Sequence, residues 1–163
     1  MLIEEVRLAP GEFFFGEGHT RVHTLLGSCV AITLWHPQRC IGGMCHYLLP
    51  SRSTNERLRR GYFADDAVNM FLEDIRASVT RPDDYEVKVF GGGNMLDGAG
   101  DGRWRFNVPE ENVAAGISLL ERHGFRVKAT DVGGTLKRNI VFELWNGDVW
   151  VKRGPGAASD RSA

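Results

Sequence analysis

The spacing of apolar residues along the chain predicts two helices. Across 63–79 apolar side chains recur every three or four residues, which is the spacing of one helix face. A second helix is expected across 109–123, where a proline and two acidic residues open the segment and a glycine follows its end. Each helix then has one apolar face, which we expect to pack against a sheet.

Shorter segments rich in β-branched and aromatic residues predict strands, separated by turn-forming Gly, Pro and Asn residues. These segments are Glu12–Phe15, Arg21–Leu25, Val30–Trp35, Cys40–Leu49, Tyr85–Phe90, Phe125–Thr130, Ile140–Leu144 and Val149–Lys152. The polar, basic segment Ser51–Arg60 lacks apolar periodicity and is expected to be a surface loop. The order strands, helix, strand, helix, strands predicts an α+β protein whose two main helices pack on mixed, mainly antiparallel sheets.

Composition favours one compact domain in a reducing compartment. With 163 residues, 42% of them hydrophobic, the chain can bury a single core; we expect a domain over 1–153 and a disordered tail over 154–163. A net charge of -1 gives no general attraction to nucleic acid or anionic lipid. The first residues lack the pattern of a secretion signal and no apolar run is long enough to span a bilayer, so we expect a cytoplasmic protein without direct membrane insertion. Its cysteines should then be free thiols.

A cysteine and a histidine on neighbouring segments are candidates for nucleophilic catalysis. Cys29 follows Gly27-Ser28, and His46 lies in the next apolar segment, so a hairpin would bring the two toward one region. A thiol attacks a carbonyl as thiolate, and histidine is its usual base. Buried cysteines and histidines are also common in apolar strands, where they are only part of the core. A third group should orient the histidine, and both Thr24 and Asp131 are candidates for it.

Two other groups of residues suggest weaker hypotheses. His36, Cys40, Cys45 and His46 are zinc-type ligands in a short stretch, but no Cys-x-x-Cys pair occurs and alternate residues of a hairpin face opposite ways. Gly91-Gly92-Gly93-Asn94 lacks the Gly-Lys-Ser/Thr ending of a phosphate loop. A close backbone approach, or a loop that lines a substrate site, is the better interpretation of these glycines.

An ordered set of short motifs extends through most of the chain. The motifs are Gly11-Glu12, Gly16-Glu17-Gly18, Thr24-Leu25-Leu26-Gly27-Ser28-Cys29-Val30-Ala31, Gly42-Gly43-Met44 with His46 and Leu49-Pro50, Phe63-Ala64-Asp65-Asp66-Ala67, Phe90-Gly91-Gly92-Gly93-Asn94-Met95, Asn112-Val113, and Asp131-Val132-Gly133-Gly134 with Arg138. Taken together they resemble the CheD family of chemoreceptor glutamine deamidases. One motif would be weak evidence, whereas this ordered set is specific.

The resemblance implies a layered α/β/β sandwich and a cysteine hydrolase that converts receptor glutamines to glutamates. Carried over by position, Cys29 is the nucleophile, His46 the base and Thr24 the residue that orients the histidine. The reaction would pass through a thioester and need neither cofactor nor metal. The implied partners are the cytoplasmic helices of chemoreceptors and a CheC-like phosphatase regulator.

Two other functions are compatible with the same resemblance. The fold could serve as an adaptor that binds receptors or a regulator with little catalysis, or the cysteine could hydrolyse receptor methyl esters. The chain also departs from the family at two places. Some members have one more residue between the threonine and the cysteine, and Val108-Pro109-Glu110-Glu111-Asn112 stands where Ile-Gly-x-Arg-Asn is common. The second difference leaves the role of segment 108–112 open.

Overall fold

The computed structural model describes residues 2–52, 57–95, 108–154 and 161–162, and it places their strands in two five-stranded sheets. The outer sheet has the order β1-β3-β8-β9-β10 and consists of β1 (Glu4–Leu8), β3 (Thr20–Leu26), β8 (Arg138–Glu143), β9 (Val149–Arg153) and β10 (Arg161–Ser162). The inner sheet has the order β2-β5-β4-β6-β7 and consists of β2 (Phe13–Glu17), β5 (Ile41–Tyr47), β4 (Val30–His36), β6 (Glu86–Gly91) and β7 (Val127–Val132). Pairing is antiparallel except between β1 and β3 and between β6 and β7.

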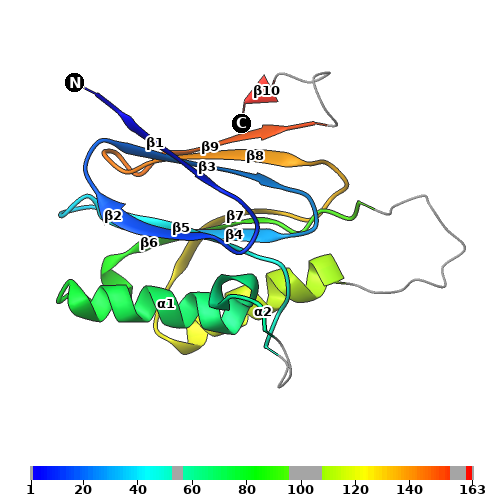
Figure 1. Cartoon of the computed structure of the whole chain (residues 1–163), viewed down its shortest axis with the longest axis horizontal. Helices are drawn as coiled ribbons and strands as arrows, with labels where there is room; N and C mark the ends of the chain where they lie inside the picture. The colour runs from blue at the N-terminus through cyan, green and yellow to red at the C-terminus, as the bar shows by residue number, and fades with distance from the viewer. Residues whose placement is uncertain (1, 53–56, 96–107, 155–160, 163) are drawn as a thin grey trace, which may run out of the picture.

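Within the described residues, two α-helices and two sheets form three layers. Helices α1 (Ala64–Ala77) and α2 (Val108–Arg122) cover one face of the inner sheet, and the outer sheet covers the other face (Figure 1). Short 3₁₀ turns occur at Arg60–Tyr62 and Pro82–Asp84. The predicted α+β class, with mixed and mainly antiparallel sheets in an α/β/β sandwich, is therefore confirmed.

The central strands of the inner sheet are apolar on both faces because each face is covered. Val30, Ile32 and Leu34 of β4 pack into the core below the helices, whereas Ala31 faces the core between the sheets. Strand β5 divides in the same way, with Tyr47 on the helix side. Period-2 alternation therefore decides which core each residue of β4 and β5 enters.

The expected elements were found, with differences at their ends. The segment expected from Phe125 pairs only from Val127, and Cys40, expected in a strand, occupies the turn before β5 with a φ of +51°. Strand β1 was not expected, although Val6 and Leu8 alternate with charged neighbours in the way that predicts a strand.

Two expected irregular segments lie partly beyond the described residues. In the expected loop Ser51–Arg60, residues 53–56 are not described. In the expected tail 154–163, the described part after Gly154 is β10, which pairs with β9. No helix in the described ranges is both long and apolar enough to cross a membrane.

Candidate active site

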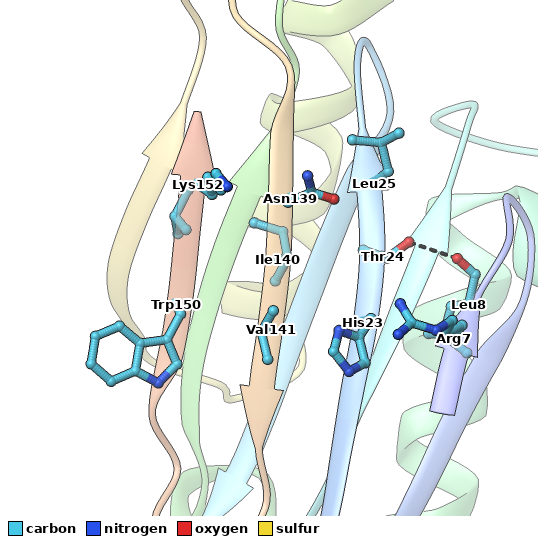
Figure 2. A pocket seen from close by; sticks show the side chains of 11 residues that line it. Arg7, Leu8, His23, Thr24, Leu25, Asn139, Ile140, Val141, Trp150 and Lys152 are labelled. Atoms are coloured by element: carbon cyan, nitrogen blue, oxygen red, sulfur yellow. Dashed lines mark hydrogen bonds between the residues drawn. The ribbon is translucent and has the colours of Figure 1, made fainter. Parts of the chain in front are cut away.

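Thr24 and His46 meet in the space between the two sheets. Thr24 is on β3 of the outer sheet and His46 on β5 of the inner sheet, and both are almost fully buried. Thr24 Oγ1 lies 2.7 Å from His46 Nδ1 and 2.9 Å from the carbonyl oxygen of Leu8. Figure 2 shows the contact between Thr24 and Leu8, which joins neighbouring strands of the outer sheet. Of the two candidates for the third group, the structure brings Thr24 to the histidine.

The two contacts of Thr24 determine which ring nitrogen of His46 carries the proton. The Leu8 carbonyl can only accept, so the single hydroxyl proton of Thr24 is donated to it. The hydroxyl oxygen then accepts from Nδ1–H of His46, and this leaves Nε2 as the unprotonated nitrogen of the neutral ring. Nε2 is buried and has no hydrogen-bond partner in the described part of the chain. Its lone pair is therefore available to accept a proton.

Cys29 lies beside His46 on the same face of the inner sheet. Ala31 pairs with His46 and Val30 with Tyr47, so Cys29 is one residue beyond the last pair and diagonal to His46. Its side chain is partly exposed and packs against the core between the sheets. Diagonal neighbours in a sheet are roughly 7–8 Å apart, which side chains can bridge. No hydrogen bond joins Cys29 Sγ to His46 Nε2 in this structure, and such bonds are often long before substrate binds.

Burial favours the neutral form of both side chains. It raises the pKa of the Cys29 thiol above its usual 9.0, while the hydroxyl of Ser28 opposes this effect. It lowers the pKa of His46 from 6.5 to about 4. At neutral pH the pair is a thiol beside a neutral imidazole, so a thiolate must form by proton transfer to Nε2 rather than exist beforehand.

The glycine-rich loop after β6 packs directly against the loop that carries Cys29. The N–H of Gly92 donates to the Cys29 carbonyl at 2.9 Å, and the N–H of Gly93 donates to the Gly27 carbonyl at 3.0 Å. A Cβ at Gly91 would collide with the Cys29 carbonyl oxygen, and Gly91 and Gly92 have φ values of +109° and +65°. The close backbone approach expected of these glycines is therefore confirmed, and it positions the backbone of Cys29.

Arg138 on β8 binds backbone carbonyls of this glycine loop and of the turn after β7. The residue is 4% exposed, and its side chain donates to Asp131 Oδ1 at 3.0 Å, to the Gly133 carbonyl at 2.7 Å and to the Gly91 carbonyl at 3.4 Å. Asp131, the other candidate for orienting His46, bonds instead to Arg138 and Arg153. No role was expected for Arg138 from its position alone, because an arginine in a strand is usually exposed.

The segment 108–112, where the chain departs from the family pattern, forms the first turn of α2. Asn112 Nδ2 donates to the Leu48 carbonyl at 2.8 Å, and the hydroxyl of Tyr47 donates to the Asn112 carbonyl at 2.5 Å. Asn112 therefore fastens the start of α2 to the residues that follow His46. Pro109 and Glu110 are in the same turn.

The zinc-type residues do not converge. Cys45 faces the core below the helices, and His46 faces the space between the sheets. His36 ends β4, and Cys40 is in the following turn, at the opposite end of the hairpin from His46. No group of three or more His, Cys, Asp or Glu side chains suited to a metal occurs in the described ranges.

Comparisons with known proteins place the chain among chemotaxis proteins. Residues 48–153 match the family model CheD, described as CheD chemotactic sensory transduction. A protein of Pseudomonas syringae pv. tomato, named probable chemoreceptor glutamine deamidase CheD, is 45% identical over 98% of this chain and 95% of its own length. Probable chemoreceptor glutamine deamidase CheD 3 of Dechloromonas aromatica is 46% identical over 97% of this chain and 92% of its own. A solved structure, the hypothetical protein YfiH of Bacillus licheniformis, is 13% identical with a TM-score of 0.48, over 76% of this chain and 50% of that chain.

Proposed function

Because the chain belongs to the CheD family, we propose that it hydrolyses the side-chain amide of specific glutamines on chemoreceptors and so converts them to glutamates. Two relatives that are 45% identical over nearly all of this chain are named probable chemoreceptor glutamine deamidase CheD. We also propose a cytoplasmic location, because the cytoplasmic helices of chemoreceptors are the proposed substrate.

The proposed nucleophile is Cys29 and the proposed base is His46. The observation that carries this proposal is the buried Nε2 of His46, which has no partner in the described residues and faces the same space between the sheets as Cys29. On substrate binding, Nε2 takes the thiol proton while Sγ attacks the carbonyl carbon of the glutamine amide. The oxygen of that carbonyl becomes an oxyanion, for which backbone N–H groups of the Gly27-Ser28-Cys29 turn are the proposed donors.

The second half of the reaction returns the enzyme to its starting state. The tetrahedral intermediate collapses, the C–N bond breaks, and the imidazolium of His46 gives its proton to the departing ammonia. Water then attacks the thioester with His46 again as the base; the glutamate carboxylate leaves and the thiol is restored. Thr24 does not touch the substrate in this scheme: it holds His46 in the tautomer that leaves Nε2 free.

The deciding experiment incubates the protein with the cytoplasmic fragment of a chemoreceptor and follows the mass increase of about 1 Da that accompanies each Gln-to-Glu conversion. We expect conversion by wild type and none by Cys29→Ala. Cys40→Ser serves as the matched control, because Cys40 is a partly exposed free thiol in the turn before β5. If neither the wild type nor Cys29→Ala converted the receptor fragment, the proposal would be refuted and receptor binding would remain as the function.

Two further points of the proposal need separate assays. A CheC-like phosphatase regulator is proposed as a second partner, and co-purification with such a protein tests it. Hydrolysis of receptor methyl esters would use the same thioester chemistry. Methanol release from a methylated receptor fragment measures that activity.

A further inference from the structure

Three exposed apolar side chains surround the loop that carries Cys29. Leu25, Met95 and Leu136 are 55%, 37% and 40% exposed, and we refer to them as the apolar rim. A Cβ at Gly27 would lie 3.3 Å from Met95, and one at Gly93 would lie 2.8 Å from Met95 and 3.1 Å from the Leu136 carbonyl. Leu25 precedes Gly27 by two residues. Large apolar side chains are thus left in solvent around the site where a substrate must enter.

The apolar rim continues into a groove on the open face of the outer sheet. The groove has a volume of about 460 Å³, and Leu25 belongs both to it and to the rim. Arg7, Trp150 and Lys152 line it from β1 and β9, as Figure 2 shows, and Trp150 is 49% exposed. No aspartate or glutamate is among its described lining residues.

The charge of this groove indicates the chemistry of its occupant. Two cationic side chains line it, namely Arg7 and Lys152. Glu5, on the same face of the sheet, is already bonded to Arg21 and His23. An apolar surface beside cationic side chains suits a partner whose apolar residues are flanked by acidic ones. Complementary charge guides the association of two such surfaces and fixes their relative orientation.

We propose that the apolar rim and this groove form the docking surface for an acidic, amphipathic helical segment of the receptor substrate. This inference rests on the proposed function, which requires a receptor glutamine to reach Cys29. On a helix, side chains three and four residues from the glutamine lie on the same face. The glutamine then enters toward Cys29 while its apolar neighbours contact Leu25, Met95 and Leu136, and acidic residues further along meet Arg7.

The test measures kcat and KM for deamidation of a receptor cytoplasmic fragment. Leu25→Ser, Leu136→Ser and Arg7→Glu should each raise KM about tenfold, with the loss in KM rather than in kcat. Val79→Ser is the matched control. Val79 is 90% exposed. The carbonyl of the adjoining Ser78 accepts a hydrogen bond from Arg39 in the turn after β4, so Val79 lies at the end of β4 that is far from Cys29. The alkylation rate of Cys29 by iodoacetamide reports whether each variant keeps its loop intact.

The outcomes separate failure of this inference from failure of the proposed function. If wild type converts glutamine but the Leu25 and Leu136 variants match Val79→Ser in KM, the docking surface is wrong. If wild type converts none, the proposed function fails. In that case each substitution is combined with Cys29→Ala, and the Kd of the receptor fragment is measured for each double variant. Binding about tenfold weaker than that of Cys29→Ala alone supports the docking surface, and equal Kd values overturn it.

Discussion

Thr24 and His46 belong to different sheets, yet Thr24 Oγ1 and His46 Nδ1 are 2.7 Å apart. The same hydroxyl reaches the Leu8 carbonyl of β1, so one side chain joins three strands. The position and the tautomer of the histidine therefore depend on how the two sheets pack against each other.

Thr24→Val should impair activity while keeping the shape of the side chain. His46 Nδ1 and the Leu8 carbonyl both lose their partner, and the ring is no longer held in the tautomer that leaves Nε2 free. We expect kcat/KM to fall about 10- to 100-fold and the free energy of unfolding to drop by about 1–3 kcal/mol. Receptor deamidation and urea unfolding measure the two effects. Thr24→Ser keeps the hydroxyl and should restore most of the activity; equal loss in both variants would contradict the hydrogen-bond argument.

The hairpin at the candidate site could be predicted, but the contact with Thr24 could not. β-Branched and aromatic residues on both sides of a turn predict the pairing of β4 and β5, and this pairing brings Cys29 near His46. Thr24 meets His46 across the space between two sheets, and no periodicity within one strand encodes such a contact. The resemblance to a family supplied Thr24, whereas spacing alone left Asp131 as an alternative.

Strand β1 and Arg138 escaped prediction for different physical reasons. Strand β1 pairs with β3 in parallel, and β2 between them joins the other sheet, so no hairpin turn marks the pairing. Arg138 is buried because backbone carbonyls and a carboxylate surround its guanidinium. Asp131 and Gly133 are only seven and five residues from Arg138, but Gly91 is 47 residues away, and only the folded chain brings all three to one guanidinium.

His46 should make the protein less stable in mild acid. Burial lowers its pKa to about 4 in the folded state from 6.5 when unfolded, so the unfolded state binds a proton more readily. The contribution of the neutral His46 to the free energy of unfolding is complete above pH 6.5. It is lost as the pH falls toward 4, and the total loss is about 3 kcal/mol. Urea unfolding at several pH values should show a shallower decline for His46→Gln over this interval. Parallel curves for wild type and variant would contradict a buried, neutral histidine.

The thiol of Cys29 should become reactive only at alkaline pH in the absence of substrate. Burial raises its pKa, and His46 is neutral beside it, so little thiolate exists near pH 7. The alkylation rate of Cys29, followed by peptide mass spectrometry, should still be rising at pH 9. Cys45 is the internal control: it is buried, its pKa is raised to about 12, and it should remain unmodified in the folded protein. A plateau that begins below pH 7 would indicate a preformed thiolate and imidazolium pair instead.

Arg138 should act on the reaction through the backbone of Cys29. Its guanidinium bonds to the Gly91 carbonyl, and the neighbouring Gly92 N–H donates to the Cys29 carbonyl. Arg138→Met removes the group that holds Asp131, Gly91 and Gly133 together and leaves buried acceptors without their donor. We expect about 1–3 kcal/mol of lost stability, because backbone carbonyls lose a donor while Asp131 keeps its bonds to Arg153.

Activity measurements separate this role from general destabilisation. Arg138→Lys keeps the charge but cannot reach three acceptors at once, so it should be more stable than Arg138→Met and still have a reduced kcat. Arg153→Met is the matched control, since Arg153 binds the same Asp131 carboxylate from the neighbouring strand β9. At a temperature where all variants are folded, we expect slower alkylation of Cys29 in Arg138→Lys than in Arg153→Met. If Arg138→Lys keeps the wild-type kcat and the wild-type alkylation rate of Cys29, Arg138 has only a structural role. The positive charge alone would then be enough to position the loop that carries Cys29.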